Sequence, residues 1–371
     1  MYLPPFLFLS SSQPWIYELA NGISRTGSII KQLLFRDLLA WIKQPDPPFI
    51  NCIVESRQVI LPPGYAGKFE FLFRPLLKNI ILHSFNRLYD SCHRQPFVFV
   101  PYPYLLPWLD DIDPSRIIYA NYDDYGLYQP SIADEIYLKE SELISKARIV
   151  LCSSLSQVNR LRLENPDSTS KIHHFPHGAT PVNRFKYIST LPLFPNSVGY
   201  IGNLIDRVDW ELVIQTAQRA TMLNFYFIGR YTTQGAISLE NWKDIRSRAF
   251  DLDNVHYIGE IRHDQVKFWY DSFSVNWMPY DIDHPFNFAS SPTKIMDCLS
   301  SVKPFVSTKI PECSLYPEYI TIVRDSVEAS KILKGFCAQT IPHDSRSQLF
   351  FAEKNSWEAR ALSLQSLLRK V

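Results

Sequence analysis

Several common signatures of protein function are absent from this sequence. Its six cysteines form no C-x-x-C pair, which argues against a zinc site or a disulfide framework and favours reduced thiols in a cytosolic protein. The nine histidines form no H-E-x-x-H motif, and no G-x-S-x-G motif indicates a serine hydrolase. No apolar run approaches the ~20 residues of a membrane-spanning helix. The net charge of +1 provides no overall field that would attract nucleic acid.

The 371 residues, of which 46% are hydrophobic, are enough for two folded domains. Apolar strand-like runs alternate with helical patterns along the chain, which predicts an α/β fold with parallel sheets. The expected strands span 5–10, 58–61, 97–100, 116–120, 149–152, 171–175, 197–204, 225–229, 255–259 and 274–280. The expected helices span 15–26, 69–93, 131–146, 155–164, 209–220, 264–270 and 355–370. A proline-containing stretch at 185–197 is predicted to link the two domains.

The segment 286–308, FNFASSPTKIMDCLSSVKPFVST, has the pattern of a phosphate- and ribose-binding site. A polar loop is expected at 287–291, followed by a short helix that begins near Thr293 and carries Lys294 and Asp297 on one face. Backbone N–H groups at the helix start and the lysine suit a diphosphate, and the carboxylate suits ribose hydroxyls. An ordinary surface helix with one charge pair is the alternative interpretation.

Three predicted strands in the second half end in glycine, at Gly202, Gly229 and Gly259. A glycine at this position lets the backbone approach phosphate or sugar groups at the carboxyl ends of the strands. Because glycine is also a common turn residue, the pattern indicates a doubly wound domain and does not identify its ligand.

In the first half, the segment 117–128, IIYANYDDYGLY, places Asp123 and Asp124 directly after a predicted strand. A carboxylate at the edge of a sheet, beside rings that stack on sugars, suits a general base for an acceptor hydroxyl. A solvated acidic turn explains the same residues without assigning them a function.

Together these segments resemble bacterial GT-B glycosyltransferases, especially the teichuronic-acid and exopolysaccharide type and the xanthan glucuronosyltransferase. The resemblance is carried by PTKIMDCLSSVKPFVST at 292–308, VGYIGNLIDRVDWELVIQTA at 198–217, YDDY at 122–125, KARIVLCSS at 146–154 and FPHGATPVNRF at 175–185. The order and spacing of the motifs match the family across the N-terminal half of the chain.

The resemblance implies a GT-B fold, an α/β architecture of two Rossmann-like domains facing a central cleft. Residues 1–185 would form the N-terminal acceptor-binding domain and residues 198–350 the C-terminal nucleotide-sugar-binding domain. Residues 351–371 would form a helix that crosses back to the N-terminal domain. The implied activity is that of a hexosyltransferase, which moves a sugar from a nucleoside diphosphate sugar to a glycan or lipid-linked acceptor in polysaccharide biosynthesis. Neither a metal nor a cofactor other than this donor substrate is expected.

The same resemblance assigns roles to individual residues. Asp297 would bind the ribose, and Lys294 with the helix start would hold the diphosphate. Asp123 is the favoured catalytic base, and Asp124 is the second candidate. The candidate donor-binding residues are Gly202, Asn203, Arg207, Arg230, Ser291, Thr293, Lys294 and Asp297. For both arginines a surface ion pair is an equally good interpretation.

The chain departs from the family pattern at informative positions. His177 stands where the family usually has asparagine, which affects the acceptor side. Asp297 replaces the usual glutamate of the nucleotide site, and Ala289 stands eight residues earlier, where retaining members have a second glutamate. The missing acid favours inversion with Asp123 as the base.

Other functions stay open. D-x-D triplets at 111–113, 251–253 and 281–283 would suit a metal-dependent transferase, although short acidic triplets are frequent by chance. A non-catalytic binding subunit would keep the fold and tolerate the changes in the motif. A sugar-nucleotide 2-epimerase with this fold would turn over the donor without any acceptor.

The segment 68–94 combines basic residues with many large apolar ones. A core helix with a solvated basic face is the favoured interpretation, and contact with anionic lipid is the alternative. We therefore expect a cytoplasmic protein, with peripheral contact at the inner face of the membrane as the alternative. The expected partners are a nucleotide sugar and a glycan or lipid-linked acceptor, and not nucleic acid.

Overall fold

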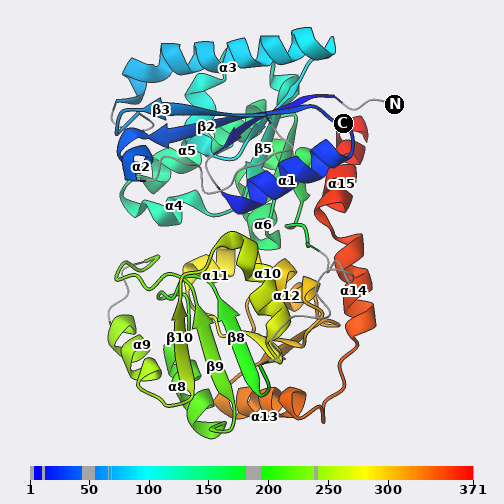
Figure 1. Cartoon of the computed structure of the whole chain (residues 1–371). Helices are drawn as coiled ribbons and strands as arrows, with labels where there is room; N and C mark the ends of the chain where they lie inside the picture. The colour runs from blue at the N-terminus through cyan, green and yellow to red at the C-terminus, as the bar shows by residue number, and fades with distance from the viewer. Residues whose placement is uncertain are drawn as a thin grey trace. The chain divides into compact units, whose positions relative to one another are not determined.

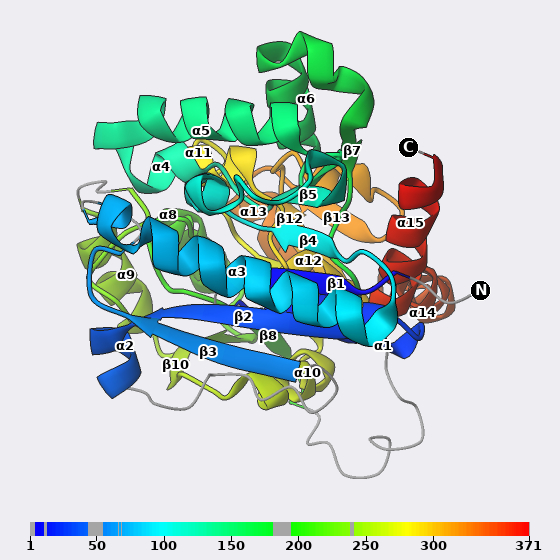
Figure 2. The same cartoon turned by 90° about the horizontal axis from the view of Figure 1, so that it is seen from above.

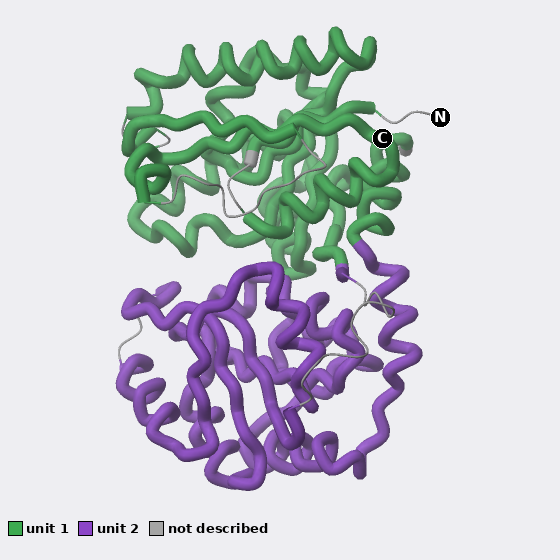
Figure 3. Tube along the Cα trace, in the orientation of Figure 1, with its two compact units in different colours: residues 1–178, 357–371 green, residues 179–356 purple. Residues whose placement is uncertain are grey.

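The computed structural model describes residues 4–10, 13–43, 55–65, 67, 69–180, 194–237 and 241–370. The chain forms two compact units, residues 1–178 with 357–371 and residues 179–356 (Figure 3). Each unit is built around its own parallel β-sheet with helices (Figure 1), so the α/β fold predicted from the sequence is confirmed.

Unit 1 contains a seven-stranded sheet in the order β3-β2-β1-β4-β5-β6-β7. Its strands are β1 (Phe6–Ser10), β2 (Ile30–Asp37), β3 (Glu55–Leu61), β4 (Phe97–Val100), β5 (Ile117–Asn121), β6 (Ile149–Cys152) and β7 (Ile172–His174). Its α-helices are α1 (Pro14–Arg25), α2 (Leu38–Lys43), α3 (Glu70–Cys92), α4 (Tyr125–Tyr128), α5 (Ala133–Lys146), α6 (Leu155–Glu164) and α15 (Trp357–Lys370).

Helices cover both faces of the unit 1 sheet, and its central strands are accordingly mostly apolar, as in FLFLS of β1 and FVFV of β4. Successive side chains of a strand point to opposite faces. In β1, Leu7 and Leu9 therefore join the core that includes residues of α3, α5 and α6, whereas Phe6 and Phe8 join the core with α1 and α15. Figure 2 shows α3 running over strands β1 and β2, which it contacts.

The sequence pattern does not predict strand β2, because Lys31 and Gln32 interrupt its apolar run. In the structure both side chains are buried and find partners on the neighbouring strand β3. Lys31 Nζ lies 2.7 Å from the carboxylate of Glu55, and the Ser56 hydroxyl donates to Gln32 Oε1 at 3.1 Å. The contacts that satisfy the polar residues of β2 come from β3, so the sequence of β2 alone does not predict the strand.

Unit 2 contains a six-stranded sheet in the order β10-β9-β8-β11-β12-β13. Its strands are β8 (Ser197–Ile201), β9 (Asn224–Ile228), β10 (Val255–Gly259), β11 (Val275–Met278), β12 (Phe305–Thr308) and β13 (Ile320–Val323). Its α-helices are α8 (Trp210–Arg219), α9 (Trp242–Phe250), α10 (His263–Ser272), α11 (Pro285–Ala289), α12 (Lys294–Ser300), α13 (Ser326–Cys337) and α14 (Ser345–Lys354).

In each sheet the first strand of the unit lies in the interior. The chain adds its next strands on one side of this strand and the later strands on the other side. In unit 1, β1 separates β2 from β4, and in unit 2, β8 separates β9 from β11. The carboxyl ends of strands at such a switch point form the usual ligand-binding crevice of open parallel sheets. The strand order therefore predicts ligand contacts in the loops after β1 and β4 in unit 1, and in the loops after β8 and β11 in unit 2.

The prediction of a polar loop at 287–291 is wrong, because helix α11 extends to Ala289 and so covers most of this segment. His284 caps this helix: its Nδ1 accepts the backbone N–H of Phe286 at 3.3 Å, and the Phe286 ring is fully buried. Residues 185–193 of the predicted linker lie outside the described residues. The chain enters unit 2 at Ala179 and returns to unit 1 with α15, which packs against α1.

Candidate functional site

A lysine lies beside a glycine turn at the switch point of unit 2. Gly202 follows β8 with a φ of 155°, a conformation that glycine adopts far more readily than other residues. A Cβ atom at this position would lie 2.9 Å from Lys294 Nζ and 3.0 Å from the Tyr200 hydroxyl oxygen. The fold thus brings together two of the predicted donor-binding residues, and any side chain larger than that of glycine would displace the lysine.

Lys294 is held by a buried tyrosine that the sequence analysis did not identify. Its ammonium donates to the Tyr280 hydroxyl at 2.5 Å and lies 5.0 Å from the centre of the Tyr280 ring. Burial alone would raise the pKa of the Tyr280 hydroxyl, but the positive charges of Lys294 and Arg207 outweigh it, so the pKa is lowered. Two cations therefore converge on one phenol.

Arg207 reaches the same place from the loop after β8. Its Nε donates to Asn287 Oδ1 and its Nη2 to the Ser290 hydroxyl, both at 2.8 Å. The guanidinium carbon lies 5.1 Å from the centre of the Tyr280 ring. These contacts fix the planar cation against an aromatic face, an arrangement that Arg favours and that suits recognition of phosphate.

The loop that carries Arg207 is anchored by the preceding residue, Asp206. The Asp206 carboxylate accepts the backbone N–H groups of Ala236 at 2.7 Å and Ile237 at 2.9 Å, and it lies 3.5 Å from Nε2 of the buried His284. Burial alone would raise the pKa of Asp206, but the contact with His284 and the two backbone N–H groups lower it. The pair ties the Arg207 loop to the start of α11.

Asp297 lies on α12, one turn after Lys294, and is half-buried. Its carboxylate is close enough to Tyr270 to contribute to the raised pKa of that hydroxyl, after the larger effects of burial and Cys298. Helix α12 has only seven residues, and Thr293, its N-cap, makes no side-chain capping bond. So short a helix adds little dipole, and the charge available for a diphosphate comes mainly from Lys294 and Arg207.

The remaining predicted donor-binding residues differ in their surroundings. Ser291 is buried. Asn203 is exposed, and its backbone carbonyl accepts the Tyr200 hydroxyl at 3.1 Å. Arg230 lies 3.4 Å from Glu260 in an exposed ion pair, the alternative that the sequence left open. Exposed pairs of this kind contribute little to stability.

Unit 1 contains a cavity of about 820 Å³ beside the carboxyl ends of β4 and β5. We call it the tyrosine pocket. Its lining consists of Gln13, Trp15, Gly64, Tyr65, Gly67, Tyr102, Pro103, Tyr104, Tyr122, Asp123, Tyr125, Tyr128, Gln129, Ile132, Glu135, Ile136 and Lys139. The rings of Tyr102 and Tyr104 are stacked with their centres 5.2 Å apart. Its size lies within the range of about 300–1,000 Å³ that ligand pockets occupy.

The two candidate catalytic carboxylates have different environments. Asp123 lines the tyrosine pocket and accepts the Tyr128 hydroxyl at 2.5 Å. Asp124 is buried and caps α4: it accepts the Gly126 backbone N–H at 3.2 Å and the Tyr137 hydroxyl at 2.9 Å. The geometry thus places Asp123 where it can meet a ligand and gives Asp124 a structural role.

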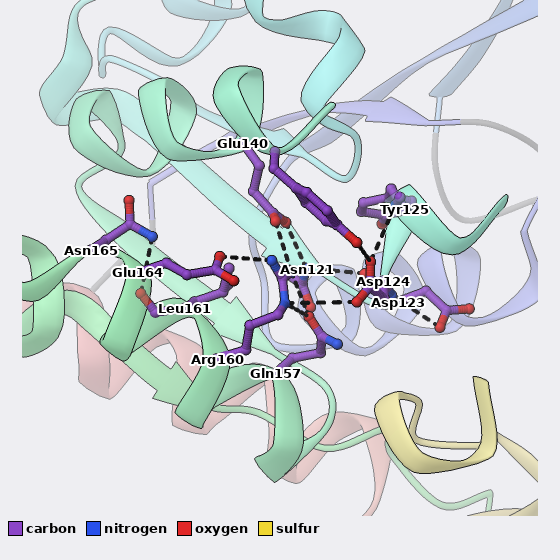
Figure 4. A network of polar contacts seen from close by, with 12 residues as sticks. Asn121, Asp123, Asp124, Tyr125, Glu140, Gln157, Arg160, Leu161, Glu164 and Asn165 are labelled. Carbon is purple, nitrogen blue, oxygen red and sulfur yellow. Dashed lines mark hydrogen bonds and ion pairs between the residues drawn. The ribbon is translucent and has the colours of Figure 1, made fainter. Parts of the chain in front are cut away.

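A buried polar network lies behind this loop (Figure 4). The Glu140 carboxylate accepts the Tyr119 hydroxyl at 2.5 Å, Asn121 Nδ2 at 2.8 Å and Arg160 Nη2 at 2.7 Å. Asn121 Nδ2 also donates to the backbone carbonyl of Asp123 at 3.1 Å. The hydrogen bonds that meet at Glu140 and Asn121 hold the backbone that presents Asp123.

The described residues contain no group of three or more histidine, cysteine, aspartate or glutamate side chains that could hold a metal ion. The triplet at 111–113 is engaged in the fold: Asp111 lies 3.2 Å from Lys78 Nζ, and Asp113 accepts the Ser115 backbone N–H at 2.9 Å. In the triplet at 281–283, Asp281 accepts the Asp283 backbone N–H at 3.0 Å.

Helix α3 covers one face of the unit 1 sheet but leaves part of its own surface apolar. Phe71, Leu72 and Leu76 are 64%, 60% and 51% exposed. Two of its basic residues lie in ion pairs within unit 1, Arg74 with Glu70 at 2.9 Å and Lys78 with Asp111. Among the described residues, no helix combines the length and apolar character needed to span a membrane.

Three tyrosines that complete the two sites were not predicted from the sequence: the buried Tyr280 and the half-buried Tyr102 and Tyr104. In unit 2, Tyr280 follows strand β11 in the run WMPY, where only its position at a strand end could have singled it out. In unit 1, Tyr102 and Tyr104 belong to the run PYPY directly after β4. Two tyrosines so close to a strand end were a usable signal for an aromatic lining.

No protein-family model matches the chain. The chain is 26% identical over 117 residues to TuaH of Bacillus subtilis (strain 168), whose provisional name is that of a teichuronic acid biosynthesis glycosyltransferase. This match covers 32% of the chain and 28% of TuaH, so it spans less than a third of either protein.

Solved structures match over the whole chain. Sucrose-phosphate synthase from Thermosynechococcus elongatus has a TM-score of 0.70 at 14% identity, with 99% of each chain covered. HepE of Anabaena, solved in complex with UDP and glucose, has a TM-score of 0.65 at 13% identity, with 100% of each chain covered. The resemblance to GT-B glycosyltransferases inferred from the sequence is therefore confirmed, and the chain has the GT-B fold of two Rossmann-like domains.

Proposed function

We propose that this chain is a glycosyltransferase that moves a sugar from a nucleoside diphosphate sugar to a glycan or lipid-linked acceptor in polysaccharide biosynthesis. The observation that carries the proposal is the convergence of Arg207 and Lys294 on Tyr280, with Lys294 beside Gly202, at the strand ends of a GT-B unit. The complex of HepE with UDP and glucose and the provisional name of TuaH support the same donor and process.

In this proposal unit 2 binds the donor. Arg207 and Lys294 neutralise the diphosphate and stabilise the negative charge that grows on it as the glycosidic bond breaks. Gly202 and Asn203 let the backbone approach the donor, and Asp297 accepts hydrogen bonds from the ribose. Ser291, Thr293 and Arg230 stay weaker candidates for the same site, Arg230 because of its exposed pair with Glu260.

Unit 1 binds the acceptor in the tyrosine pocket. Asp123 removes the proton from the attacking hydroxyl as the bond to the donor sugar forms, which gives an inverting reaction. The two cations of unit 2 supply the positive charge that a metal ion supplies in metal-dependent transferases, so turnover requires no metal.

We also propose a cytoplasmic location with peripheral contact at the inner face of the membrane, through the exposed side chains of α3. Phe71, Leu72 and Leu76 would insert apolar surface, because Arg74 and Lys78 are engaged in ion pairs. Flotation with vesicles containing anionic lipid tests this: the wild-type protein should float with the vesicles and Leu72→Glu should not. Equal behaviour of the two proteins would contradict the contact.

Release of nucleoside diphosphate from a panel of donors, with and without acceptor glycans, tests the function. A transferase releases the diphosphate quickly only with an acceptor. Turnover of the donor sugar without an acceptor would instead indicate an epimerase, and donor binding without turnover would indicate a binding subunit. Chelator should leave the rate unchanged, and loss of activity that Mn²⁺ restores would contradict the metal-independent mechanism.

A further inference from the structure

The tyrosine pocket offers aromatic faces and neutral hydrogen-bonding groups. Six tyrosines and one tryptophan line it, together with the amides of Gln13 and Gln129. Rings that pack against sugar faces, with amide and hydroxyl groups at their edges, are a suitable surface for a carbohydrate. This composition defines the kind of ligand but not its charge.

Three tyrosine hydroxyls of the pocket, those of Tyr65, Tyr104 and Tyr125, stay neutral over the physiological range because their pKa values are raised. Burial raises the pKa of Tyr65 to about 12, with smaller contributions from Asp37 and Tyr102. Burial also raises the pKa values of Tyr104 and Tyr125 well above the ordinary value for tyrosine. These groups therefore act as uncharged donors and acceptors.

The charged side chains of the described lining are Asp123, Glu135 and Lys139, which sum to a negative charge. The single cation among them, Lys139, lies 2.7 Å from the Glu135 carboxylate one helical turn earlier on α5. An anionic ligand entering the pocket would meet this negative lining and would have to draw Lys139 away from Glu135. Placing like charges together in a partly desolvated site is unfavourable.

We propose that the tyrosine pocket binds an uncharged sugar of the acceptor and rejects sugars that carry a carboxylate or a phosphate. The inference rests on the proposed function, which makes this pocket the acceptor site, and it narrows the acceptor to neutral hexoses and N-acetylhexosamines. A diphosphate that links an acceptor to lipid would then stay outside this pocket.

A matched pair of ligands tests the charge selection directly. Methyl β-glucoside and methyl β-glucuronide differ only in having a hydroxymethyl group or a carboxylate at one position. Saturation-transfer NMR without donor should show the glucoside binding at least tenfold more tightly than the glucuronide. Equal affinities, or tighter binding of the glucuronide, would overturn the inference.

The variant Glu135→Gln sharpens the test, because it releases Lys139 without touching the proposed base. The lining then carries one negative charge less, and the preference for the glucoside should shrink severalfold through improved binding of the glucuronide. Glu142→Gln is the matched control: Glu142 lies 2.9 Å from Lys146 in the same kind of pair on α5, and neither residue lines the pocket. A change of equal size in both variants, or no change in Glu135→Gln, would contradict the assignment.

The same measurements separate this inference from the proposed function. If a neutral sugar binds unit 1 but the protein transfers no sugar, the transferase proposal is contradicted and the pocket assignment stands. If the protein transfers a sugar efficiently to acceptors that end in a uronate, the proposed selection against charged sugars is contradicted and the transferase proposal stands.

Discussion

The two units place tyrosines in opposite electrostatic surroundings. In unit 1, the half-buried Tyr65 lies in the tyrosine pocket, and desolvation with the negative charge of Asp37 raises its pKa to about 12. In unit 2, Tyr280 is more deeply buried, yet Lys294 and Arg207 lower its pKa. The same side chain is thus more firmly neutral in one unit and easier to ionise in the other.

This difference shows which unit is prepared for which ligand. The surroundings that favour a tyrosinate at Tyr280 also favour a diphosphate there, because both are anions facing the same two cations. The described lining of the tyrosine pocket carries two carboxylates and one ammonium group, so its charge disfavours an anion. The comparison predicts that donor and acceptor variants affect separate measurements.

The largest expected effect is on the chemical step. Asp123→Asn should lower the transfer rate by about 10²–10⁴-fold, because it removes the proposed base, and should leave binding of nucleoside diphosphate unchanged. Asp124→Asn should instead mainly affect stability, since Asp124 caps α4. A rate loss confined to Asp124→Asn would exchange the two roles, and retention of full rate in both variants would place the base elsewhere.

A smaller loss is expected in donor binding. Lys294→Ala removes a charge-assisted contact of about 1.5–3 kcal/mol, so calorimetry should show nucleoside diphosphate binding weakened by about 10–150-fold. Arg230→Ala is the control, because Arg230 lies in an exposed pair with Glu260, and it should change the affinity by less than about threefold. Equal losses of affinity in the two variants would contradict the assignment of Lys294, rather than Arg230, to the diphosphate site.

Asp297→Ala tests the ribose contact. It should weaken nucleoside diphosphate binding by about tenfold or more, because it removes one or two charge-assisted hydrogen bonds of about 1.5–3 kcal/mol each, while the fold persists. Binding of inorganic diphosphate, which has no ribose, should stay as in the wild type. An unchanged affinity for the nucleotide would end the assignment.

The mildest effect concerns pH. Because the pKa of Tyr280 is lowered, its hydroxyl ionises below the ordinary value of about 10, and the resulting anion should weaken diphosphate binding severalfold as the pH rises. Tyr280→Phe should abolish this loss of diphosphate affinity at alkaline pH. The variant should also bind diphosphate slightly more weakly than the wild type at neutral pH. Tyr200→Phe should keep the alkaline loss but move it to higher pH, because the hydrogen bond with the Tyr200 hydroxyl helps to lower the pKa of Tyr280. An alkaline loss that persists in Tyr280→Phe would contradict the role of Tyr280.

The sequence was most informative where local patterns determine the structure. Strand β6 at Ile149–Cys152 and helix α6 at Leu155–Glu164 have the predicted bounds, because a short apolar run and a capped helix are encoded locally. Strand β2 was missed, since its polar residues are satisfied by β3. Helix α11 was missed because Asn287, polar but buried, takes its partners from Arg207 in a distant loop.

The candidate sites were predictable in part for the same reason. The motif around Lys294 and the acidic loop at Asp123 are contiguous in sequence, whereas the contacts of Tyr280 depend on how β8, β11 and α12 come together. A motif names the charged residues, and only the fold shows which neutral side chains hold them in place.

Hydrogen–deuterium exchange measured separately with UDP and with methyl β-glucoside tests the central claim most directly. UDP should give its strongest protection in peptides covering 202–207 and 280–297 of unit 2, and the glucoside should protect peptides covering 122–139 of unit 1. Protection by UDP confined to 122–139, with none in unit 2, would contradict the assignment of the anionic donor to unit 2 and the neutral acceptor to unit 1.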